Sequence, residues 1–197
     1  HAQHQDANDS VSLRLIINTG SNDEGDDELG YAHFVEHMAF NGTTHFPGET
    51  LGATLAQVGI RFGPEVNAFT SPDQTVYQLD LSHNDPATVE LALKVMRDWC
   101  DGLAFDSDQV KRERKVVLAE MTARGIINGA FTQERMGFAY PDHPLGDRFV
   151  AGTPRSVDSA KAEGLRSFYH RWYRPENAVL AVVGNFPPEQ ISAQIQQ

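Results

Sequence analysis

Two histidines, His33 and His37, are four residues apart in the stretch HFVEHMAF, and Glu36 lies between them. Residues four apart lie on one face of an α-helix, one turn above the other. Two imidazoles in that arrangement can bind one metal ion, and the neighbouring carboxylate can accept a proton. The order H-x-x-E-H is the inverse of the common zinc-protease motif. It predicts metal-dependent hydrolysis, with peptide bonds as the expected substrate.

A catalytic zinc site normally has three protein ligands and one open position. The third ligand must therefore come from another part of the chain. The downstream segment ERKVVLAE offers two carboxylates, Glu113 and Glu120, which are seven residues apart. On a helix both would lie on the same face. Spacing by itself leaves open which of the two completes the site.

Size, charge and cysteine content exclude several classes of protein. The chain has 197 residues, of which 40% are apolar and 22% are charged, as in water-soluble globular domains. A net charge of −11 without a basic patch argues against a nucleic-acid partner. No apolar run is long enough to span a membrane. The single cysteine, Cys100, excludes an internal disulfide and a cage of thiolates.

The chain begins at His1 without an initiating methionine. We therefore expect it to be a piece of a longer protein, and the absence of a signal segment leaves the compartment open.

Hydrophobic periodicity predicts alternating helices and strands without strict βαβ order. Expected strands are 11–18, 65–70, 74–82 and 177–186, and expected helices are 29–40, 49–58, 85–100, 106–125, 131–139, 158–172 and one from 187. We expect Asp27 and Glu28 to stabilise the start of the first helix through its dipole. The pattern predicts one α+β domain over residues 1–197, with helices packed mainly on one face of the sheet.

Beyond the motif, longer segments carry a family resemblance. HFVEHMAFNGT followed by ERKVVLAEM resembles the pitrilysin/insulinase zinc peptidases, the M16 type. GIRFGPEVNAFTSPDQTVYQLDL and FYHRWYRPENAVLAVVGNF are also similar to segments of that family. The resemblance covers residues 11–190 and looks closest to a bacterial subgroup of zinc proteases. It implies a mostly antiparallel sheet, the M16 metallopeptidase or LuxS-like half.

The resemblance also implies roles for the residues of the motif. His33, His37 and Glu120 would bind one zinc ion per chain. Glu36 would be the general base, and Glu113 would orient a ligand or the reacting water. In such a site zinc activates a water molecule and polarises the scissile carbonyl.

Substrate and partner expectations follow from the same resemblance. Asn67 and Ala68 would lie on a strand that lines the cleft and pairs with the backbone of a peptide or unfolded polypeptide. Family members are clamshells of two homologous halves, so we expect a second M16-type domain or subunit, fused or separate. Related bacterial proteins are often exported, which favours the periplasm.

Plainer interpretations remain for each residue. The two histidines could be ordinary helix-face residues, since short motifs recur by chance, and Glu113 could be a surface partner at i,i+4. Two other functions also stay open. One is a non-catalytic or partner-dependent peptide-binding subunit, and the other is a zinc hydrolase of a non-peptide substrate. The presence of every metal-site residue favours the zinc metallopeptidase.

Overall fold

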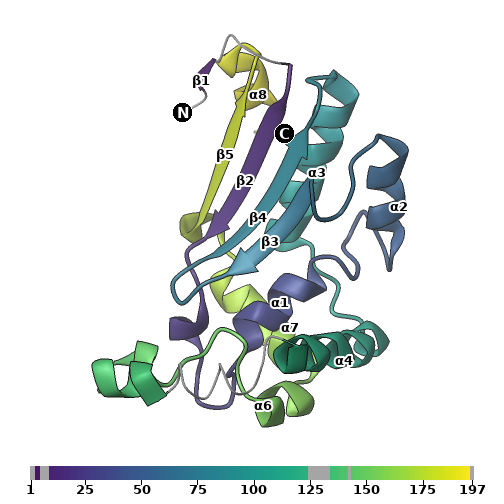
Figure 1. Ribbon diagram of the computed structural model, residues 1–197. Coiled ribbons are helices and arrows are strands. Elements are labelled where there is room, and N and C mark those ends of the chain that lie inside the picture. The colour runs from purple at the N-terminus through teal and green to yellow at the C-terminus, as the bar shows by residue number, and fades with distance from the viewer. Residues whose placement is uncertain (1–2, 5–8, 124–133, 142, 196–197) are drawn as a thin grey trace.

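The computed structural model describes residues 3–4, 9–123, 134–141 and 143–195 (Figure 1). Five strands form one sheet in the order β1-β5-β2-β4-β3. Their bounds are β1 Gln3–His4, β2 Val11–Ile17, β3 Val66–Thr70, β4 Thr75–Leu81 and β5 Ala178–Gly184. All neighbours pair antiparallel except the short β1, which runs parallel to β5. The sheet is thus mostly antiparallel, and β3 lies at one edge.

Alternation along β2 explains why helices cover one face of the sheet. The four residues that point to the helical side are at most 3% exposed: Val11, Leu13, Leu15 and Ile17. Ser12 and Arg14 point to the opposite face, where both donate hydrogen bonds to the Asp80 carboxylate of β4. Because side chains alternate between faces, this strand buries one face and leaves the other, with Ser12, Arg14 and Ile16, partly exposed.

The helices are α1 Tyr31–Met38, α2 Thr50–Gln57, α3 Pro86–Asp101, α4 Ser107–Ala123, α6 Pro154–Ser159, α7 Ala162–Trp172 and α8 Pro188–Ile195. Helix α3 contacts β2 and β4, and its Trp99 stacks on Tyr77 with 5.2 Å between ring centroids. Helices α1, α4, α6 and α7 gather at the lower end of the sheet in Figure 1. The predicted α+β architecture is confirmed. Cys100 is partly buried against the core, as expected for a small apolar residue.

The predicted helix 158–172 is confirmed over α7, Ala162–Trp172, but its start is wrong, because residues 158–159 belong to the separate helix α6. Helix α6 begins at a capping box in which Thr153 and Ser156 bond each other's backbone N–H groups, and Pro154 opens its first turn. The backbone then turns extended at Ala160, with ψ 133°, before α7 starts. Thr153-Pro154 is a helix start signal, and it accounts for the additional helix.

The predicted helices 131–139 and 85–100 can be compared with the structure. Residues 134–139 are helical, whereas residues 131–133 of that predicted helix lie outside the described part of the chain. Asp85 caps α3, since its carboxylate accepts the Thr88 N–H at 3.0 Å. Within the described ranges, no helix has both the length and the apolar character that a membrane crossing requires.

Candidate metal centre

Helix α1 is eight residues long and carries the H-x-x-E-H motif. It contacts β3 and β4 of the sheet and helices α4 and α7. Seven of its residues are buried, including His33 and Glu36. A short helix enclosed in this way has little freedom to rotate, so its side chains point in fixed directions.

The start of α1 is held by Glu24, which the sequence analysis missed. Gly30, the residue before the helix, has φ 90° and provides no side-chain cap. The Glu24 carboxylate accepts the N–H groups of Gly30 at 2.8 Å and Ala32 at 2.9 Å. The expectation that Asp27 and Glu28 support the helix start is wrong, because α1 begins at Tyr31 with no acidic residue in its first turn. The Glu28 carboxylate accepts the Gly25 N–H instead. Glu24 lies six and eight residues before the N–H groups that it binds, and no local capping pattern spans that distance.

We expect Glu24 to make the free energy of unfolding depend on pH. Burial raises its pKa from 4.5 to about 8, against the opposing effect of the two backbone hydrogen bonds. Between those values the folded state holds a proton that the unfolded state has released. The free energy of unfolding should therefore fall as pH rises from 4.5 towards 8, by up to about 1.4 kcal/mol per pH unit.

Urea unfolding of zinc-free residues 1–197 at several pH values, with Glu24→Gln beside the wild type, isolates this contribution. The glutamine cannot ionise, so the stability difference should shift in favour of the variant as pH rises. Parallel profiles for the two proteins would show that the pKa of Glu24 is not raised.

Three predicted ligand side chains converge where α1 meets α4. The Nε2 atoms of His33 and His37 are 3.2 Å apart, and Glu120 Oε2 lies 3.7 Å and 3.1 Å from them. One ligand atom from each residue lies within 4.8 Å of the other two. Among the described residues, this is the group of histidine, cysteine and acidic side chains that could hold a metal ion.

Glu113 determines which nitrogen of His37 can bind a metal. Its Oε1 lies 2.7 Å from His37 Nδ1, so that nitrogen carries the proton and donates it. Nε2 then has its lone pair directed at Glu120 and His33. Asn41 donates from Nδ2 to Glu113 Oε2 at 2.8 Å and to the His37 carbonyl at 3.0 Å. Carboxylates that fix a ligand imidazole in this way are typical of metal sites.

The electrostatics of the centre suit a cation. Burial alone would lower the pKa of His37, but the hydrogen bond with Glu113 and the nearby carboxylates Glu36 and Glu120 raise it. A zinc ion would satisfy the same negative charge while replacing a proton. Two imidazole nitrogens and one carboxylate oxygen are also ligands that zinc prefers, and three protein ligands leave a position open. The residues present therefore fit a catalytic zinc ion.

Glu36 lies beside this group but faces β3. Its side chain is buried, with 8% of the residue exposed. The Thr70 hydroxyl, at the end of β3, donates to Glu36 Oε2 at 2.6 Å. A carboxylate next to the convergent ligands is suited to proton transfer.

The predicted substrate strand lies at the sheet edge. Ladder bonds to β4 fall on alternate residues of this hairpin, and Glu65 accepts one from Asp80 at 2.8 Å. Ala68, three positions on, therefore directs its N–H to the outer edge. There Asn67 Oδ1 accepts that N–H at 2.9 Å. The structure thus places Asn67 and Ala68 on an edge strand that contacts α1.

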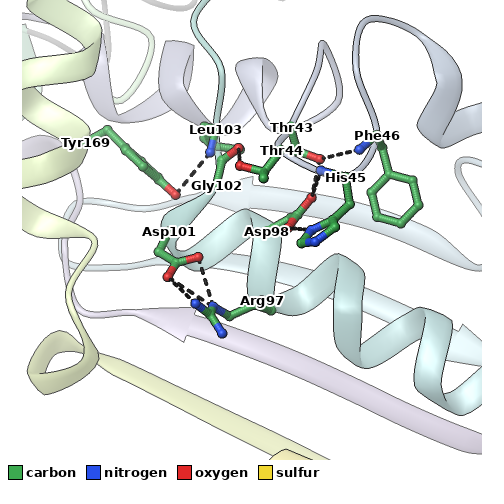
Figure 2. Close-up of polar contacts among 10 residues, drawn as sticks. All are labelled: Thr43, Thr44, His45, Phe46, Arg97, Asp98, Asp101, Gly102, Leu103 and Tyr169. Carbon is green, nitrogen blue, oxygen red and sulfur yellow. Dashed lines mark hydrogen bonds and ion pairs between the residues drawn. The ribbon is translucent and has the colours of Figure 1, made fainter. Parts of the chain in front are cut away.

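The loop after α1 is fastened to α3 through Asp98 (Figure 2). This carboxylate is 2% exposed and accepts the Thr43 hydroxyl at 2.5 Å and the His45 N–H at 2.8 Å. Its other oxygen lies 2.7 Å from His45 Nδ1. Trp99 donates to the Ala39 carbonyl at 3.0 Å. The C-terminal end of α1 is therefore anchored as firmly as its start.

Glu24, Asn41 and Thr70 are the residues at this centre that sequence reasoning missed. In the sequence, Asn41 and Thr70 occur only inside segments that resemble the family. Asn41 and Thr70 form hydrogen bonds to residues that are distant in sequence. Glu24 bonds to residues that are nearby, but no local sequence pattern indicates that bond. A motif scan can find the ligands of such a centre, but not the groups that hold them.

The chain is similar to known proteins both in family and to individual relatives. The family model for insulinase, peptidase family M16, matches residues 1–126. The model for the peptidase M16 inactive domain matches residues 159–197. The chain is 38% identical over 192 residues to a probable zinc protease, PqqL, of Escherichia coli. That alignment covers 98% of this chain but 21% of the relative, so the chain spans about a fifth of its length.

Solved structures are similar over nearly the whole chain. The first half of the periplasmic protease PqqL from Escherichia coli matches with TM-score 0.90, over 95% of this chain and 40% of that one. A mutant of the ferredoxin protease FusC, in complex with Arabidopsis ferredoxin, also matches with TM-score 0.90 at 29% identity. That match covers 98% of this chain and 21% of the other.

Proposed function

Because this chain belongs to the insulinase family, peptidase family M16, we propose that it is the metal-bearing domain of a zinc-dependent endopeptidase. The observation that carries the proposal is the convergence of His33 Nε2, His37 Nε2 and Glu120 Oε2 beside the Glu36 carboxylate. The curated relatives are named as zinc proteases. A fold by itself does not support the inference of an activity, whereas a complete set of metal ligands next to a general base does.

One zinc ion per chain would be held by His33, His37 and Glu120. When bound, zinc supplies a Lewis acid that makes a water molecule more acidic and polarises the scissile carbonyl. Glu113 keeps the His37 proton on Nδ1 and so leaves Nε2 available as a ligand. Asn41 holds Glu113 in that position.

Glu36 would act as the general base. It accepts a proton from the attacking water and returns it to the leaving amine, the usual work of a positioned carboxylate in hydrolysis. Its position one residue before His37 keeps it next to the ligand group. Its burial and its bond to Thr70 limit its motion.

The substrate would be an extended peptide or an unfolded polypeptide. The outward N–H of Ala68 lies on an edge strand next to α1, where a substrate carbonyl would replace the Asn67 Oδ1 that accepts it. An extended chain can add to such an edge as a further strand, and its backbone supplies the hydrogen bonds. A folded segment could not pair in this way, because its backbone groups are already bonded.

The chain spans about a fifth of the length of its PqqL relatives. We therefore propose that residues 1–197 form one domain of a longer protein, and that a second homologous domain or subunit closes over the metal. The similar structure from Escherichia coli is described as a periplasmic protease. The periplasm is accordingly the proposed compartment for this protein, and no nucleic-acid partner is proposed.

A peptide-binding subunit without catalysis is the second candidate. It is favoured by the match of residues 159–197 to the model of the inactive domain. The seven candidate site residues, however, lie between residues 33 and 120, within the match to the peptidase model: His33, Glu36, His37, Asn67, Ala68, Glu113 and Glu120. This placement makes the peptidase the leading proposal.

Turnover of an unstructured peptide tests the proposal. The full-length protein should cleave it, lose activity with a chelator and regain it with zinc. Residues 1–197 alone should fold and bind zinc but cleave far more slowly, because a second half is needed to close the cleft and exclude water. Adding the remaining part of the protein in trans should restore part of the rate.

Zinc occupancy must be equal in the fragment and the full-length protein for this comparison. Equal kcat/KM would show that the domain is self-sufficient and would overturn the need for a second half. Peptide binding without zinc-dependent turnover in the full-length protein would favour the binding subunit.

A further inference from the structure

A short hydrogen bond joins Glu36 to the last residue of β3. Thr70 Oγ1 donates to Glu36 Oε2 at 2.6 Å. Hydroxyl-to-carboxylate bonds of that length are charge-assisted and belong to the stronger class in proteins. The terminal torsion of a glutamate is broad when nothing restrains it. The hydroxyl therefore selects one orientation of the carboxylate plane.

The position of Thr70 is itself fixed by a tight turn. Ser71 donates its N–H to the Gln74 carbonyl at 2.8 Å, and the Ser71 hydroxyl bonds to Asp73 Oδ1 at 2.7 Å. Across the turn, Thr75 pairs with Thr70 and is fully buried. The turn therefore holds the hydroxyl of Thr70 at a constant place relative to the sheet.

The turn packs directly on the segment that leads into α1. A Cβ at Gly20 would lie 2.1 Å from the Ser71 carbonyl oxygen and 2.6 Å from the carbonyl carbon of Pro72, so only glycine permits this approach. Asn22 also donates its N–H to the Pro72 carbonyl at 2.8 Å. Two residues further on, Glu24 binds the start of α1. One segment thus sets the positions of both Thr70 and the helix that carries Glu36.

We propose that Thr70 is a positioning residue for Glu36. Its hydrogen bond to Oε2 holds the carboxylate in the orientation from which it exchanges a proton with the attacking water. This inference rests on the proposed peptidase function. It adds a residue that acts through the base and does not bind the metal.

The test uses the full-length protein and two substitutions at one position. Thr70→Val keeps the shape of the side chain and removes the donor, whereas Thr70→Ser keeps the donor. Thr54→Val is the control, since the Thr54 hydroxyl donates to the Thr50 carbonyl of its own helix at 2.9 Å. Zinc content and the dissociation constant of an unstructured peptide are measured beside kcat and KM.

Thr70→Val should lower kcat about 10–100-fold, the usual effect of losing a group that orients a catalytic residue. Zinc content, peptide affinity and KM should stay close to the wild type, and Thr70→Ser should recover most of the rate. In a Glu36→Gln background, Thr70→Val should have no further effect, because the group that it positions is gone.

Several results would overturn the inference. Full kcat in Thr70→Val, or an equal loss in the Glu36→Gln background, would show that Thr70 does not act through Glu36. A change confined to KM and peptide affinity would make it a substrate contact, and loss of zinc would make it structural. If the wild-type protein has no zinc-dependent turnover, the proposed function itself fails, and the positioning role fails with it.

Discussion

Glu36→Gln is expected to lower kcat of the full-length protein by about 10²–10⁴-fold, the range for loss of one general base. Glutamine has the shape of glutamate but cannot accept a proton at neutral pH. It can still receive the Thr70 hydrogen bond through its amide oxygen, so the fold should persist. Glu36 is not in the group of side chains that could hold the metal, and zinc content should therefore stay unchanged. Steady-state kinetics and metal analysis of the same preparation check both statements.

Glu113→Gln is the matched control on α4. Glu113 touches His37 and Asn41 and does not belong to the convergent ligand group. Its loss should be milder, about 10–100-fold in metal affinity or rate. An unchanged kcat in Glu36→Gln would exclude Glu36 as the base. A loss of zinc in that variant would instead make Glu36 a ligand.

His37→Ala is expected to abolish stoichiometric zinc binding. Among the three ligand atoms, His37 Nε2 lies between the other two, at 3.2 Å from His33 Nε2 and 3.1 Å from Glu120 Oε2. Removing it leaves two ligands, fewer than catalytic zinc sites use. It also leaves the partly buried Glu113 carboxylate without its imidazole partner. Metal analysis after equilibration with limiting zinc measures the effect.

His170→Ala is the control for this experiment, because His170 is exposed on α7, away from the motif. It should keep the full zinc content. Retention of one zinc per chain in His37→Ala would exclude the ligand set proposed here. Loss of zinc in both variants would point to unfolding, which circular dichroism would detect.

Local patterns in the sequence determined much of the fold. Alternation in residues 11–18 predicted β2 and its buried face, because side chains in a strand alternate with period two. The expected helix 85–100 agrees with α3, Pro86–Asp101, to within one residue at each end. The start of the predicted helix 158–172 was wrong because a second helix, α6, begins upstream at Pro154 and ends at Ser159. The backbone is extended at Ala160, and α7 starts only at Ala162.

The sequence also determined the chemistry of the candidate centre. Spacing of four put His33 and His37 on one face of a helix, and the resemblance added Glu120 from α4. These inferences need only helix geometry and a family pattern. They therefore identified the residues but not their distances or orientations.

Tertiary structure alone decided how the centre is held. Glu113 reaches His37 across 76 positions of sequence, and Thr70 reaches Glu36 across 34. Glu24 replaces a missing cap at Gly30, and Gly20 lets the turn after β3 pack against the segment that leads to α1. Such contacts depend on how separate elements pack. Short-range periodicity carries no information about them, because it reports only which face of an element is apolar.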